Sequence, residues 1–142
     1  MRRAVTSVVC GVILMLVACG GGGTTVDVTL QEFAVALDPS SVEAGETTFV
    51  AKNGGPDDVH EMVVFRTDLA ITDLPTLDDG SVDETGEGIE LIGEIEDIAV
   101  GSTEEVTLDL DAGAYVVICN IYDAEEDEAH YQEGMRAPLT VT

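Results

Sequence analysis

The chain has 142 residues, 45% of them hydrophobic, and its 29 acidic residues outnumber five Lys and Arg, giving a formal net charge of −24. So few cations exclude nucleic-acid binding through phosphate contacts. Beyond residue 18 the only cations are Lys52, Arg66 and Arg136. The negative charge favours a strongly solvated surface, or a surface that docks a cationic partner protein.

The N-terminus has the pattern of a secretory signal. Two arginines follow Met1, residues 8–17 are apolar, and the run Leu16-Val17-Ala18-Cys19 comes next. The apolar stretch is too short for a membrane-spanning helix. Leu-Val-Ala-Cys resembles a bacterial lipobox, which implies that residues 1–18 are removed and that Cys19 is lipidated. An ordinary cleaved signal is the alternative. The lipobox implies an extracytoplasmic protein, lipid-anchored to the bacterial cell membrane.

The remaining chain predicts a tether and one domain. Residues 19–25 are glycine-rich and predict a flexible tether, and residues 26–142 suit a single domain. Short alternating segments between turn residues predict strands at 25–30, 47–52, 60–66, 89–98, 103–110, 114–121 and 136–142. Residues 31–37 are expected to continue in an extended conformation, and 68–75 to form a short helix or an irregular turn. This pattern predicts an all-β sandwich of about seven or eight strands.

Cys119 has no cysteine to pair with. Cys10 lies in the signal and Cys19 in the lipobox, so no internal disulfide is expected. An unpaired thiol in an oxidising compartment indicates metal ligation, or a small buried hydrophobic side chain.

Other metal-binding side chains accompany this cysteine. His60 begins a predicted strand, and His130 and Met135 follow Cys119 closely. Two histidines, one thiolate and one weak thioether are the ligand set of a blue-copper site. Alternation along the strands places both His60 and Cys119 on inward faces at strand ends. A buried core histidine and a packing methionine are the alternatives to ligation.

The order of these ligands, one histidine early and Cys, His and Met clustered late, resembles the cupredoxins, small blue-copper proteins such as plastocyanin and pseudoazurin. Asn53-Gly54 before the first histidine and Gly134-Met135 also resemble plastocyanin-like domains. The resemblance implies a Greek-key β-sandwich in which His60, Cys119 and His130 bind one type 1 copper ion in a plane, with Met135 axial. It implies a monomeric electron carrier with a redox partner protein, not an enzyme.

Two features depart from the small cupredoxins. Ten residues, Asn120 to Ala129, separate the cysteine from the second histidine, a longer interval than is usual. Residues 123–129 are therefore expected to form an exposed acidic insert, which is a solvated loop, a docking patch or a cation site. Glu61 follows the first histidine where plastocyanin-like chains often carry an asparagine that ties the copper loops together. Asn120 is placed to take part of that role.

Three functions are compatible with this sequence. The first is one-electron transfer through copper at the cell envelope. The others are copper delivery or storage at the envelope and a metal-free cupredoxin-like binding module. The sequence lacks the further histidines of a nitrite reductase or multicopper oxidase, and the second thiolate of a dinuclear copper centre. No hydrolase signature surrounds Cys119.

Overall fold

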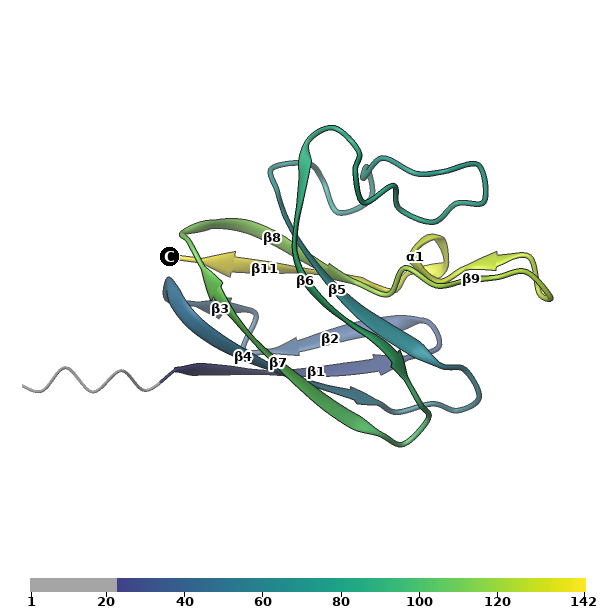
Figure 1. Cartoon of the computed structure of the whole chain (residues 1–142), viewed down its shortest axis with the longest axis horizontal. Coiled ribbons are helices and arrows are strands. Elements are labelled where there is room, and N and C mark those ends of the chain that lie inside the picture. The colour runs from purple at the N-terminus through teal and green to yellow at the C-terminus, as the bar shows by residue number, and fades with distance from the viewer. Residues whose placement is uncertain (1–22) are drawn as a thin grey trace, which may run out of the picture.

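The structure, a computed structural model, describes residues 23–142, which form a β-sandwich (Figure 1). The predicted signal peptide (residues 1–18) and the predicted lipidation site Cys19 lie outside the described residues. The strands are β1 (Thr24–Gln31), β2 (Ala34–Asp38), β3 (Ser41–Val42), β4 (Gly45–Asn53), β5 (His60–Thr67), β6 (Ile89–Ile98), β7 (Thr103–Leu110), β8 (Gly113–Ile118), β9 (Tyr122–Asp123), β10 (Glu128–Ala129) and β11 (Arg136–Val141), with one helical turn, α1 (His130–Glu133). No helix of the described part is long and apolar enough to cross a membrane.

Two sheets make the sandwich. One has the order β2-β1-β4-β7 and the other β3-β11-β8-β5-β6. β1 pairs parallel with β4 and antiparallel with β2. Strict alternation in β1 buries Val26, Val28 and Leu30 and exposes the residues between them. These buried side chains pack against the inner face of the second sheet, so one apolar layer holds the sandwich together.

The central strands β5 and β8 of the second sheet are buried on both faces. Met62 and Val64 of β5 face the inter-sheet core, whereas Val63 and Phe65 belong to a second apolar cluster on the outer face. The segment between β5 and β6 covers that outer face, and its Leu74 and Val82 belong to the second cluster. This explains why β5 is almost continuously apolar rather than alternating.

The all-β sandwich expected from the sequence is confirmed, with eight of its strands five or more residues long. The extended conformation expected for residues 31–37 is interrupted at Glu32 and Phe33. The chain reverses at Glu32 and Phe33, and β2 returns antiparallel to β1. A two-residue turn preserves the alternation on both sides, so periodicity alone does not reveal the reversal. β8 ends at Ile118, one residue before Cys119, and residues 68–75 form an irregular turn rather than a short helix.

Candidate metal centre

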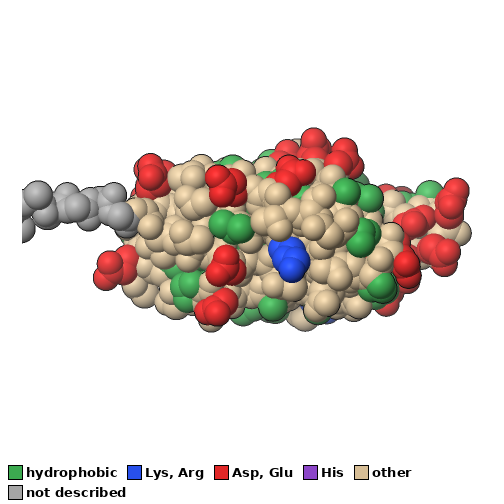
Figure 2. Space-filling model, turned by 90° about the horizontal axis from the view of Figure 1, so that it is seen from below, with side chains coloured by type: hydrophobic (Ala, Val, Ile, Leu, Met, Phe, Trp, Pro, Cys, Tyr) green, Lys and Arg blue, Asp and Glu red, His purple; other side chains and the backbone are tan. Residues whose placement is uncertain are grey.

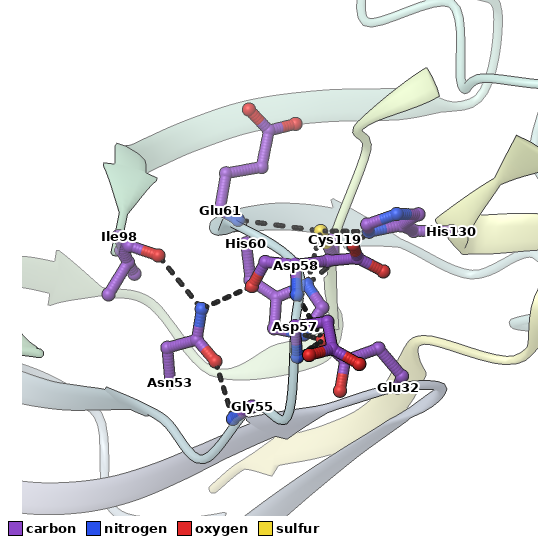
Figure 3. Close-up of polar contacts among 10 residues, drawn as sticks. All are labelled: Glu32, Asn53, Gly55, Asp57, Asp58, His60, Glu61, Ile98, Cys119 and His130. Atoms are coloured by element: carbon purple, nitrogen blue, oxygen red, sulfur yellow. Dashed lines mark hydrogen bonds and ion pairs between the residues drawn. The ribbon is translucent and has the colours of Figure 1, made fainter. Parts of the chain in front are cut away.

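Three of the four predicted ligand residues, His60, Cys119 and His130, meet at one end of the sandwich (Figure 3). His60 is the first residue of β5, Cys119 directly follows β8, and His130 is the first residue of α1. β5 and β8 are antiparallel neighbours with Val63 opposite Ile118, so the beginning of β5 lies beside the end of β8. All three side chains are buried.

The three donor atoms form a compact triangle. His60 Nδ1 and His130 Nδ1 are 3.3 Å apart, and Cys119 Sγ lies 3.4 Å from His130 Nδ1 and 3.9 Å from His60 Nδ1. A triangle with these sides has a circumscribed radius of about 2.1 Å, within the roughly 2.0–2.3 Å at which His nitrogen and Cys sulfur bind zinc. The triangle therefore fits a first-row metal ion without rearrangement.

Met135 lies next to this triangle along the backbone. Its N–H donates to His130 O at 3.0 Å, and its carbonyl accepts from Cys119 N–H at 3.1 Å. The side chain is fully buried in the inter-sheet core, in the same apolar cluster as Cys119. The methionine is thus tied to both neighbours, and its role as an axial ligand remains a prediction.

The chain segment between Cys119 and His130 folds into a hairpin. β9 and β10 pair as a short antiparallel hairpin, with Asp123 opposite Glu128. His130 N–H donates to Ile121 O at 2.9 Å, so the excursion begins and ends at neighbouring residues. The hairpin projects from the end of the sandwich (Figure 1). The predicted exposed insert is therefore a hairpin that returns the second histidine to the cysteine.

A buried asparagine fixes the loop before His60. The Nδ2 of Asn53 donates to Asp58 O at 2.8 Å and to Ile98 O at 2.9 Å, and its Oδ1 accepts from Gly55 N–H at 2.8 Å. Gly55 has a φ of 69°, which glycine adopts without steric cost. The side chain of Asn53, which the sequence suggested only as part of a family-like turn, thus joins the loop to β6.

Glu32 lies on the outer side of the His60 ring. Its Oε1 is 3.5 Å from His60 Nε2 and accepts from the N–H groups of Asp57 at 3.2 Å and Asp58 at 2.6 Å. Burial alone raises the pKa of the Glu32 carboxyl, but these backbone hydrogen bonds outweigh burial, so the pKa is lowered. Burial, reinforced by the nearby His130, lowers the pKa of His60. No sequence pattern pointed to Glu32, because it lies in a turn of the other sheet.

The thiol of Cys119 is deeply buried. Burial raises its pKa to about 12, although the N–H of Glu61 donates to Sγ at 3.4 Å and opposes that rise. A thiolate at neutral pH therefore requires a stronger positive charge than the protein itself supplies. A metal ion supplies such a charge and displaces the thiol proton.

Glu61 and Asn120 link the cysteine to its surroundings. Glu61 Oε1 accepts from Asn120 N–H at 3.1 Å, and burial, followed by repulsion from three nearby glutamates, raises the pKa of Glu61 to about 7. The Asn120 side chain bonds outward, accepting from Val82 N–H at 2.6 Å and donating to Val82 O at 3.0 Å. Asn120 thus joins the loop after Cys119 to β5 through its backbone and to the covering segment through its side chain.

His130 is shielded from solvent. It is 1% exposed, and the ring of Phe33 packs edge-on against it with centroids 5.3 Å apart. A surface hollow of about 470 Å³ reaches the histidine, and four aspartates line it: Asp57, Asp58, Asp97 and Asp123. Any partner that approaches His130 through this hollow meets negative charge.

Comparisons with known proteins show what this chain is similar to. No protein-family profile and no curated protein matches it in sequence. Its structure is similar to reduced auracyanin from Roseiflexus castenholzii, with a TM-score of 0.58, 21% identity and coverage of 86% of this chain and 99% of that one. It is also similar to auracyanin A from Chloroflexus aurantiacus, described as a "blue" copper protein, with a TM-score of 0.58, 22% identity and coverage of 85% of this chain and 100% of that one. For an azurin from Methylomonas sp. strain J the TM-score is 0.56, with 16% identity and coverage of 84% of this chain and 98% of that one. At these identities the likeness establishes the fold alone.

Proposed function

We propose that this chain, which has the cupredoxin fold, binds one type 1 copper ion through His60, Cys119 and His130 and carries single electrons. The observation that supports the proposal most strongly is the buried triangle of two imidazole nitrogens and one sulfur, with sides of 3.3–3.9 Å. Two histidines and one cysteine in a trigonal arrangement are the ligands of blue-copper electron-transfer sites. The role is electron transfer rather than catalysis.

Copper bound there would supply a one-electron couple between Cu(II) and Cu(I). The protein contributes a fixed ligand set. His60 begins a strand that is hydrogen-bonded on both sides, and the backbone of Met135 bonds to both Cys119 and His130. Burial of all four side chains excludes water from the site. A frame that holds the ligands in place reduces the rearrangement that accompanies a change of oxidation state. Met135 is proposed as the weak axial ligand.

We also propose a cationic redox partner that docks over the hollow beside His130. The four aspartates of the hollow and the net charge of −24 support this partner. Acidic side chains are spread over the face shown in Figure 2 and gather at the end where the hairpin β9–β10 projects. Opposite charges on partners raise the association rate, and salt screens that attraction.

We propose that the protein is located at the cell envelope and is anchored to the membrane through a lipid on Cys19. The lipobox-like sequence supports this location. β1 begins at the end of the sandwich opposite the hairpin, the same end at which the C-terminus lies (Figure 1). An anchor attached ahead of β1 would leave the metal end free to meet a partner.

The test is the visible spectrum of the purified protein after addition of Cu(II), with Cys119→Ser as the paired variant. The proposal predicts an intense thiolate-to-copper band at one copper per chain, absent from C119S. Tight copper binding without this band would favour copper delivery or storage instead. No stoichiometric uptake would leave the metal-free binding module as the remaining function.

A further inference from the structure

We propose that the Glu32 carboxylate is a positioning residue that orients His60 and biases a copper ion at this site toward Cu(II). This inference rests on the proposed copper function. It concerns a contact that crosses the sandwich, since Glu32 follows β1 of one sheet and His60 begins β5 of the other. Figure 3 shows both residues with the loop that joins them to Asn53.

At this contact each residue has one buried polar atom without a hydrogen-bond partner. His60 Nε2 and Glu32 Oε2 are both enclosed and make no hydrogen bond. His60 is 0% exposed, and Nε2 lies 3.5 Å from Glu32 Oε1. This separation is slightly longer than an N–H···O hydrogen bond, so a small shift of either side chain completes one. A buried imidazole N–H without an acceptor is costly, which favours that pairing.

The contact between Glu32 and His60 selects one tautomer of the His60 ring. A neutral imidazole carries its proton on a single nitrogen. Nδ1 faces Cys119 Sγ and His130 Nδ1, whereas Nε2 faces the carboxylate. A proton on Nε2 therefore leaves the Nδ1 lone pair directed at the metal position. A carboxylate behind a histidine ligand orients the ring and makes it a stronger base.

The carboxylate itself is held in place. The N–H groups of Asp57 and Asp58 both donate to Oε1, from the loop that leads into His60. Hydrogen bonds from backbone N–H groups favour the charged form of a carboxylate. A fixed negative charge close to a ligand stabilises the doubly charged ion more than the singly charged one. The expected consequence is a lower reduction potential.

The first experiment compares Glu32→Gln with Asp57→Asn in the copper-loaded protein. Glutamine retains an acceptor oxygen for His60 but removes the charge. D57N removes a nearby charge that does not contact the ring and keeps the backbone N–H. We expect E32Q to lower the ratio of Cu(II) to Cu(I) affinity by about tenfold, equivalent to a potential raised by about 59 mV. D57N should change that ratio less than about twofold. Equal shifts in the two variants would overturn the proposal.

The second experiment uses the copper-free protein. Nitrogen-15 NMR of the His60 ring should show the Nε2–H form in the wild type and in E32Q. In Glu32→Ala a substantial Nδ1–H population should appear, and an unchanged ring in E32A would overturn the positioning role. If E32A does not fold, the comparison of E32Q with D57N decides. If the wild type gives no blue band, the copper function fails, while the NMR result still decides the contact between Glu32 and His60.

Discussion

The two histidines of the site are held by parts of the fold that differ in kind. His60 begins an eight-residue strand, follows a loop fixed by the buried Asn53 side chain and faces Glu32 from the opposite sheet. His130 begins a four-residue helix after a projecting hairpin and is held mainly by local backbone bonds. The strand half of the site is thus positioned by buried contacts between distant segments. The loop half is positioned mainly by backbone bonds within one excursion, with further side-chain bonds to the segment between β5 and β6. The strand half should be the more costly to disturb.

Asn53→Ala should give the largest effect on stability. The substitution leaves the Gly55 N–H and the carbonyls of Asp58 and Ile98 without their partner. We expect the free energy of unfolding of the copper-free protein to fall by about 3 kcal/mol, measured by urea denaturation. Thr48→Ala is the control, because it removes an exposed hydrogen bond from the same strand, β4. A loss in N53A no larger than in T48A would show that the strand half is not specially constrained.

Asn120→Ala tests the loop half by the same means. Asn120 is only partly buried, and its side chain bonds to Val82 and Glu84 of the covering segment. The expected loss is about 1–2 kcal/mol, smaller than in N53A because water can replace part of these bonds. Hydrogen exchange at the Val82 amide should become faster, since that N–H loses its acceptor. A Val82 amide that stays as protected as in the wild type would rule out the link.

A pH series tests whether copper binding releases the proton of the Cys119 thiol. The pKa of the Cys119 thiol is raised to about 12 by burial, and burial lowers that of His60. Near pH 8 the thiol is therefore protonated and the His60 ring neutral, so metal binding releases the thiol proton. Copper affinity should rise tenfold per pH unit, about 1.4 kcal/mol, from about pH 7.5 to about pH 9. Competition with a chelator measures this slope, and a wild-type affinity independent of pH would contradict it.

Shortening the hairpin should have the smallest effect. Residues 124–127 connect β9 to β10 and are exposed. Replacing them with Asn-Gly, a favoured two-residue turn, should change the free energy of unfolding by less than about 0.5 kcal/mol. The visible copper band should also be unchanged. Loss of the band in this variant, despite a folded domain, would show that the hairpin tip helps to form the site.

Sequence reasoning located the features that depend on the local pattern of residue types, such as strands and the order of the metal-binding side chains. Alternation located most of the strands and put His60 and Cys119 on inward faces, and the structure brings both together with His130. The ligand order indicated the cupredoxin fold, which the structural comparisons establish. These features are predictable because periodicity and residue type are local properties of the chain.

The features that sequence reasoning missed depend on contacts between distant segments. Glu32 reaches His60 only because the chain reverses at residues 32–33 and the two sheets then face each other. The shielding of His130 by Phe33 has the same origin. The segment between β5 and β6 looked like an irregular loop, yet Tyr131 binds it by donating to Ile71 O and accepting from Leu74 N–H. No periodic pattern encodes such pairings.

The most direct test of the central claim is a spectroelectrochemical titration of the copper-loaded protein, following the visible band as the potential is stepped down and back. Electron transfer by a fixed ligand set predicts a reversible one-electron transition, with the band lost on reduction and fully recovered on reoxidation, and no copper released. Copper release on reduction, or a band that does not return, would contradict the account of this protein as an electron carrier.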